Sequence, residues 1–204
     1  MLDILLECLS KRKSSAIVFN QYSDKDILNN LKVFFEYLVK SKSKVLLIGE
    51  APGYKGCRLT GIPFTSGIAI KNTRHEALVE LIPKIRLNKT IPENTASILW
   101  EFLGTNKPIP ILWNAFPFHP HKEGILESNR KPNKEELLEG SEYLHMVNEI
   151  FRPKKVFALG RVGEVSLRAL FPEKEIGYIR HPSYGGKKQF IEGVSKVFNQ
   201  PSLK

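Results

Sequence analysis

The sequence contains little cysteine: Cys8 and Cys57 are the only two thiols among its 204 residues. Two thiols are too few for a disulfide scaffold, for a four-thiolate metal site or for an iron–sulfur cluster. The composition therefore favours a protein of a reducing compartment, the cytoplasm, and it predicts no metal centre.

Long apolar runs and nucleotide-binding loops are missing as well. No run approaches the roughly 18 residues of a membrane-spanning helix, and the early charges Asp3, Glu7 and Lys11 do not follow the order of a signal peptide. The chain holds neither a G-x-G-x-x-G motif nor a Walker loop, which bind dinucleotides and nucleoside triphosphates. We therefore expect no membrane partner and no organic cofactor.

Acidic residues are in deficit, and this imbalance points to a class of partner. Asp and Glu number 21 against 31 Lys and Arg, so the formal net charge is +10. An excess of this size favours a polyanion, and nucleic acid is the first candidate.

Four short apolar runs, each typical of a strand buried on both faces of a sheet, alternate with helical stretches. The runs are residues 44–49, 109–113, 155–160 and 176–179, and the helical stretches are 27–40, 73–103, 133–151 and 161–171. Ser23 and Asp26 have the spacing of a capping box ahead of the first helix. This alternation predicts an α/β fold, a three-layer α/β/α sandwich with a central four-stranded parallel sheet. We expect a single domain over residues 1–204, with 1–43 as an N-terminal helical extension packed on it.

The ends of the predicted strands carry the residues with the most chemical potential, and ligands of open parallel sheets bind at the carboxyl ends of strands. Glu50 follows the first strand, where a carboxylate is costly unless it is solvated, hydrogen-bonded or faced by positive charge. It is either a functional carboxylate or an acceptor for the N–H groups of the turn from Ala51 to Gly53.

Three further residues at this edge each have two interpretations. Asn114 offers a donor and an acceptor that together read a base edge, or it shapes a turn. Phe64 stands in a loop and either stacks on a base or packs in the core. His181 precedes Pro182, which favours extended backbone, and is either catalytic or a structural hydrogen-bonding group.

Other motifs are less specific. His119-Pro120-His121 has alternating potential metal ligands, but the basic residues that follow favour a solvated loop facing phosphate. The glycines of Gly160-Arg161-Val162-Gly163 suit phosphate binding at a helix N-terminus and tight strand–helix packing equally well. Lys187 and Lys188, after Tyr184-Gly185-Gly186, predict a basic, hairpin-like segment along a DNA strand, or an ordinary surface turn.

The motifs taken together resemble the uracil-DNA glycosylase superfamily in their order and spacing. The resemblance rests on Gly49-Glu50-Ala51-Pro52-Gly53, Gly61-x-Pro63-Phe64, Asn114 through Pro120, and His181-Pro182-Ser183. It extends from about Lys44 to Phe190 and is greatest to the branch whose first motif reads G-E-A-P-G.

The resemblance implies an enzyme that flips a deoxyuridine out of DNA and hydrolyses its N-glycosidic bond, the first step of base excision repair. We expect a monomer, as is usual for an enzyme that acts on one flipped base. It implies that Glu50 acts beside the sugar and that His181 donates to uracil O2. Phe64 would stack on the base and Asn114 would pair with its O4 and N3–H. The remaining implied contacts are Gly49, Ala51 and Gly53 to uracil, and Ser66, Arg180, Ser183, Lys187 and Lys188 to DNA.

The sequence also departs from the superfamily pattern. Members of the G-E-A-P-G branch carry four cysteines that bind an iron–sulfur cluster, and Phe118 stands where one of them is expected. In the most active branch an aspartate positions water and a tyrosine excludes thymine, whereas Ala51 and Gly53 stand at these positions here. Two alternatives stay open: a protein that binds DNA or a modified base without cleaving it, and an enzyme that hydrolyses a free nucleoside or nucleotide.

Overall fold

The computed structural model describes residues 1–183 and 185–199. Tyr184, in the predicted basic segment, and residues 200–204 lie outside the described part. The strands of the main sheet are β2 (Val45–Gly49), β3 (Ile111–Asn114), β5 (Lys155–Leu159) and β6 (Ile176–Ile179). They pair in the order β3-β2-β5-β6, and every pair is parallel. The predicted four-stranded parallel sheet is therefore confirmed.

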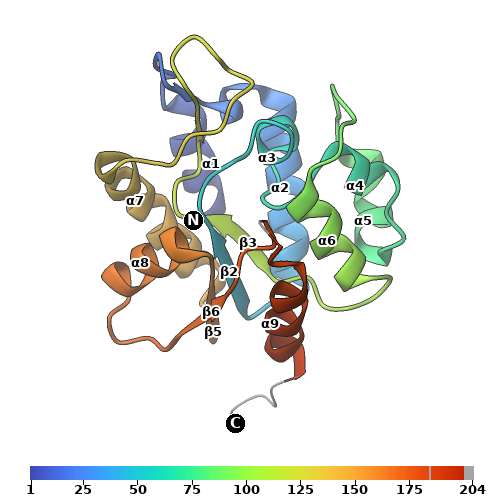
Figure 1. Cartoon of the computed structure of the whole chain (residues 1–204). Helices are drawn as coiled ribbons and strands as arrows, with labels where there is room; N and C mark the ends of the chain where they lie inside the picture. The colour runs from blue at the N-terminus through green and yellow to red at the C-terminus, as the bar shows by residue number, and fades with distance from the viewer. Residues whose placement is uncertain (184, 200–204) are drawn as a thin grey trace.

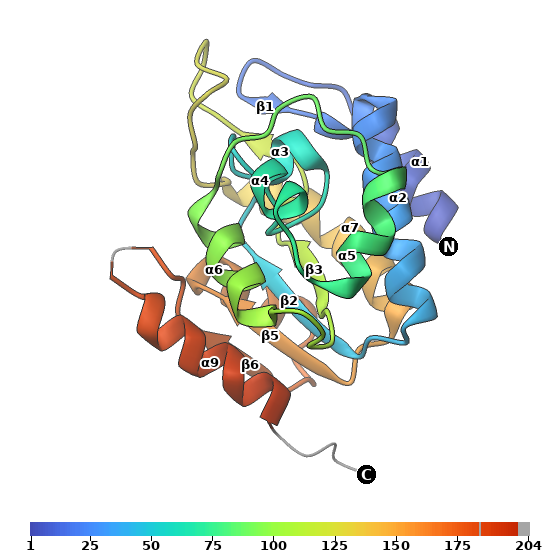
Figure 2. The same cartoon turned by 90° about the vertical axis from the view of Figure 1, so that its right-hand side faces the viewer.

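Helices cover both faces of this sheet, as the alternation of elements predicted. Figure 1 shows α7 (Lys134–Phe151) and α8 (Arg161–Leu170) on one side, and α6 (Asn94–Leu103) and α9 (Lys187–Asn199) on the other. The view in Figure 2 agrees, with α6 and α9 in front of the strands and α7 behind them. Because both faces are covered, β2 buries Leu46, Leu47 and Ile48, which are each at most 2% exposed.

The N-terminal helices bury their apolar faces in the same hydrophobic core as the sheet. Leu5 and Leu9 of α1 (Leu2–Lys11) are fully buried, and so is Phe35 of α2 (Lys25–Lys40). The Phe35 ring lies 5.6 Å from Trp113 of β3 and 5.1 Å from Phe151 of α7, measured between ring centroids. This part of the chain therefore contributes directly to the packing at the β3 edge.

The remaining elements are short. They are β1 (Val18–Phe19), η1 (Gln21–Ser23), α3 (Cys57–Thr60), α4 (Gly67–Lys71), α5 (Glu76–Leu81), η2 (Ile82–Lys84) and β4 (His119–Pro120). β1 and β4 pair in an antiparallel two-stranded sheet that the sequence analysis did not predict. Two residues per strand are too few for an alternating pattern to be visible in the sequence.

Two local predictions are corrected. Asp24 caps α2 by accepting from the N–H groups of Asp26 and Ile27, whereas Ser23 belongs to η1 and donates to the Asn20 carbonyl. Lys187 and Lys188 do not form a hairpin-like segment, because they are the first two residues of α9. The helix forms because Phe190, Val194 and Val197 recur at helical spacing and are buried.

The structure decides between the two interpretations of the glycines near the start of α8. A Cβ at Gly163 would lie 2.6 Å from the carbonyl oxygen of Ile48, so α8 approaches β2 too closely for any side chain. Gly160 has φ of +84°, which favours glycine on its own. Tight strand–helix packing therefore accounts for Gly163, and the backbone conformation accounts for Gly160.

Candidate active site

Gly49, Phe64 and Asn114 meet at the carboxyl end of β2. Gly49 is paired in register with Asn114 on β3. A Cβ built on Gly49 would overlap the Phe64 ring and lie 2.9 Å from the Asn114 Oδ1. The sequence predicts these three residues at one edge of the sheet, and the structure brings them into contact.

Gly49→Ala is expected to destabilise the fold, because the added methyl group has to displace both neighbours. Overpacking of this kind typically costs about 1–3 kcal/mol of unfolding free energy, which denaturant titration measures. Gly53→Ala is the matched control, since its Cβ would come no closer than 3.8 Å to Asn129. Equal stability of the two variants would contradict the close approach at Gly49.

The loop before α4 holds Phe64 in an unfavourable backbone conformation. Phe64 has φ of +53°, in the left-handed region that non-glycine residues rarely adopt. The Thr60 hydroxyl donates to the Thr65 carbonyl at 2.9 Å, and the Thr65 hydroxyl accepts from the Trp100 indole at 3.1 Å. Backbone strain of about 1–3 kcal/mol is typical of functional sites, and here it directs an aromatic ring over Gly49.

Asn114 has an amide that is buried but not used within the fold. The residue is 5% exposed. Its side chain makes no hydrogen bond with any residue in 1–183 or 185–199. Its donor and acceptor are therefore both available for a polar ligand.

Glu50 lies beside these residues, half-buried. Burial raises the pKa of its carboxyl, and the positive charge of Lys131 lowers it again in part. Phe116 donates its N–H to the Glu50 backbone carbonyl at 3.0 Å, which ties the turn to the segment after β3. Within the described residues the Glu50 carboxylate accepts no backbone hydrogen bond, so the turn-acceptor interpretation has no support in the structure.

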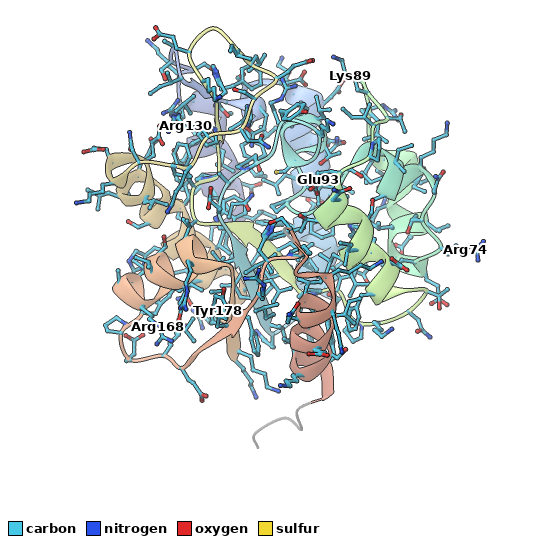
Figure 3. The ribbon with its side chains drawn as sticks, viewed as in Figure 1. Arg74, Lys89, Glu93, Arg130, Arg168 and Tyr178 are labelled. Carbon is cyan, nitrogen blue, oxygen red and sulfur yellow. The ribbon has the colours of Figure 1, made fainter. Side chains whose placement is uncertain are left out.

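His181 follows β6, and its local contacts determine which ring nitrogen carries the proton. The Ser183 backbone N–H faces Nδ1 at 3.2 Å, and the Ser183 hydroxyl lies 2.7 Å from the same atom. A backbone N–H only donates, so Nδ1 accepts and the proton of the neutral ring is on Nε2. Burial lowers the pKa of His181 and favours this neutral form, although Glu93 opposes the effect. Figure 3 shows Glu93 at the amino end of α6.

The chain is similar to known proteins in sequence and in fold. The family model of the uracil DNA glycosylase superfamily matches residues 35–190. This chain belongs to the uracil DNA glycosylase superfamily. No curated protein matches the chain. The crystal structure of wild-type SMUG2 from Pedobacter heparinus is similar, with a TM-score of 0.64 and 16% identity over 97% of this chain and 96% of that one. At this identity the likeness shows the fold.

The two histidines near β4 are buried, whereas the sequence predicted a solvated loop. His119 and His121 are 0% and 7% exposed, so they do not belong to a solvated loop. The His119 ring lies between the carbonyls of Pro52 and Leu126. Arg130, labelled in Figure 3, forms two hydrogen bonds of 2.9 and 2.7 Å with Glu136. Within the described residues, no group of three or more His, Cys, Asp or Glu could hold a metal ion.

The place of the iron–sulfur cysteine of related superfamily members is filled by an aromatic cluster. Phe118 is fully buried, and its ring meets the edges of Tyr22, Phe116 and Tyr143 at centroid distances of 5.3–6.4 Å. Arg12 lies over the same ring at 5.1 Å. An iron–sulfur cluster does not fit these residues, and packing of aromatic rings stabilises this region instead.

The residues predicted to contact DNA differ in their accessibility. Arg180, Ser183 and Lys188 are exposed, and Lys187 forms an exposed ion pair with Glu101 at 3.2 Å. Ser66 is fully buried, and its hydroxyl caps α4 by accepting from the Ala69 N–H. The Ser66 side chain is therefore occupied inside the fold.

Among the described residues, we find no helix with the length and apolar character of a membrane span.

Four residues that the sequence analysis gave no role at this site contribute to it. Lys131 and Glu93 set the charge around Glu50 and His181. Asn129 accepts from the Tyr54 N–H at 3.0 Å, and His119 lies 2.7 Å from the Pro52 carbonyl. The contact of Asn129 with Tyr54 spans 75 residues of sequence and has no local signal.

Proposed function

We propose that this protein is a monofunctional DNA glycosylase that hydrolyses the N-glycosidic bond of a flipped-out uracil, or of another deaminated base, and leaves an abasic site. The observation that carries the proposal is the arrangement at the carboxyl end of β2. There Phe64 and the unused Asn114 amide meet over Gly49, with Glu50 beside them. The net charge of +10 supports DNA as the partner. An enzyme that acts on one flipped base at a time is expected to be a monomer.

In the proposed reaction a water oxygen bonds to C1′ of the sugar while the bond from C1′ to the base nitrogen breaks. The base leaves with the bonding electron pair, so positive charge grows on the sugar and negative charge on the base. The Glu50 carboxylate stabilises the sugar directly or accepts the proton of the water. The Nε2–H of His181 donates to O2 of the departing base, and both interactions strengthen toward the transition state.

We assign recognition of the base to the side chains of Phe64 and Asn114. Phe64 stacks on its face, and the Asn114 amide pairs with O4 and N3–H. Cytosine presents the opposite donor and acceptor pattern at these atoms, so it would leave buried polar groups unpaired. Ala51 has no polar group to hold the attacking water, so we expect slow turnover.

The experiment is a single-turnover incubation of excess protein with end-labelled oligonucleotides that contain one uracil, hypoxanthine or thymine. Alkaline cleavage then reveals abasic sites. A band from the uracil strand supports the proposal, and an oligonucleotide with cytosine at the same position is the control. If no lesion yields a band while the DNA still binds, the protein is a binding module, the alternative favoured by Ala51. Excision from free nucleosides without salt-dependent DNA binding would identify a nucleoside hydrolase.

Lys131→Ala is expected to move the acid limb of the pH–rate profile toward higher pH. Burial raises the pKa of Glu50 and Lys131 lowers it, so removal of Lys131 leaves the pKa higher still. The ionised carboxylate is the active form. In the variant it becomes protonated at a higher pH than in the wild type, so the excision rate also falls at a higher pH. Single-turnover rates between pH 4.5 and 8 measure the shift, and Lys134→Ala, an exposed lysine of α7, is the control. Identical profiles for the two variants would contradict the assignment.

A further inference from the structure

His119 is a buried residue that none of the roles described so far requires. It lies on β4 and is 0% exposed. Its Nδ1 is 2.7 Å from the carbonyl oxygen of Pro52, and its Nε2 is 3.1 Å from that of Leu126. Pro52 belongs to the turn that carries Glu50, and Leu126 belongs to the loop between β4 and α7.

Both neighbours of the imidazole only accept hydrogen bonds, so its protonation state decides which contact is a bond. Burial lowers the pKa of His119, and Arg58 and His121 lower it further, although the two carbonyls raise it. The neutral ring has one N–H to donate. The ring nitrogen without a proton turns its lone pair toward a carbonyl oxygen, and this repulsion is smaller at the 3.1 Å of Leu126 than at the 2.7 Å of Pro52. The proton therefore belongs on Nδ1, which donates to the Pro52 carbonyl.

The rest of the turn is held at other points. Ala115 and Phe116 donate their N–H groups to the carbonyls of Gly49 and Glu50 at 2.8 and 3.0 Å. Asn129 accepts from the Tyr54 N–H. Pro52 has no N–H of its own, and among the described residues no side chain other than His119 donates to its carbonyl.

We infer that His119 is a positioning residue: its Nδ1–H holds the Pro52 carbonyl and so keeps the turn that carries the Glu50 carboxylate in place beside the reacting sugar. This inference rests on the proposed glycosylase function. The backbone of His119 is anchored independently, because β4 pairs with β1 with Phe19 opposite His119. The side chain can therefore be changed while the strand stays in place.

Two substitutions separate the two ring nitrogens. The amide nitrogen of asparagine reaches the position of Nδ1, and that of glutamine reaches the position of Nε2. His119→Asn thus keeps a donor for Pro52, whereas His119→Gln offers one to Leu126 only. We expect His119→Gln to lower the single-turnover excision rate about tenfold or more, because small displacements of a reacting group are costly. His119→Asn restores most of the rate, and the affinity for uracil-containing DNA is equal in both.

Amide hydrogen exchange across residues 50–56 gives a second readout that needs no activity. Exchange should be faster in His119→Gln than in the wild type, and close to the wild type in His119→Asn. His145→Gln, at an exposed histidine of α7, is the control for both measurements. Equal rates and equal exchange in the two His119 variants would overturn the inference. If the wild type excises no base, the proposed function fails, and the exchange difference alone then decides whether His119 positions the turn.

Discussion

Glu50→Gln is expected to lower the single-turnover rate of base excision by about 10²–10⁴-fold, the usual effect of removing a positioned acid–base group. Glutamine has nearly the same shape as glutamate but no negative charge. It can neither stabilise positive charge on the sugar nor accept a proton from water. The carboxylate makes no backbone hydrogen bond within the described residues, so the loss of charge should leave the fold intact.

The measurement compares excision rates and DNA affinities of Glu50→Gln and the wild type with the same uracil-containing strand. Affinity should be unchanged or higher, because a negative charge near the phosphates is removed. Glu123→Gln, an exposed carboxylate in the loop after β4, is the matched control. A Glu50→Gln rate within threefold of the wild type, a margin of roughly 0.7 kcal/mol, would assign the water-activating role to another group.

His181→Ala is expected to lower the same rate by about 10²–10³-fold, as removal of one donor to a developing oxyanion commonly does. The Ser183 N–H makes Nδ1 an acceptor, so the donor is Nε2–H. His181→Gln places an amide nitrogen near the Nε2 position and should recover part of the rate. Protonation of His181 turns Nδ1 into a donor and so breaks its contact with the Ser183 N–H.

Ser183→Ala separates the two contacts at Nδ1. It removes the hydroxyl at 2.7 Å but keeps the backbone N–H, so the tautomer and most of the rate should persist.

If His181→Ala retained the rate of the wild type while binding DNA equally well, the departing base would have to leave without this donor, and the proposed role of His181 would be wrong.

Local patterns were sufficient for the regular elements. The capping box of Asn133 and Glu136 begins α7 where the sequence predicted a helix, because both partners lie within one turn. The apolar runs became strands because a strand with both faces covered needs an apolar residue at nearly every position. Short elements such as α3 and β4 were not predicted, since four or two residues carry no measurable period.

The composition and order of residues were also enough to place Glu50, Phe64, Asn114 and His181 at one edge of the sheet. Parallel strands of a sheet end at the same edge, so residues that follow them converge whatever the details of the packing. The same reasoning did not place Ser66 correctly, because its hydroxyl caps α4, and a helix of five residues is too short to show a period in the sequence.

The sequence by itself thus determined the fold class, the sheet and the edge at which the chemistry belongs, since these follow from periodicity and strand direction, which are local properties. Only the tertiary structure decided which groups touch. The burial of His119 against Pro52, the contact of Asn129 with Tyr54, and the facing of Lys131 toward Glu50 join residues that lie 67, 75 and about 80 positions apart. Hydrogen-bond partners, tautomers and pKa shifts depend on such contacts, because each is set by the atoms within a few ångströms and not by neighbours in the chain.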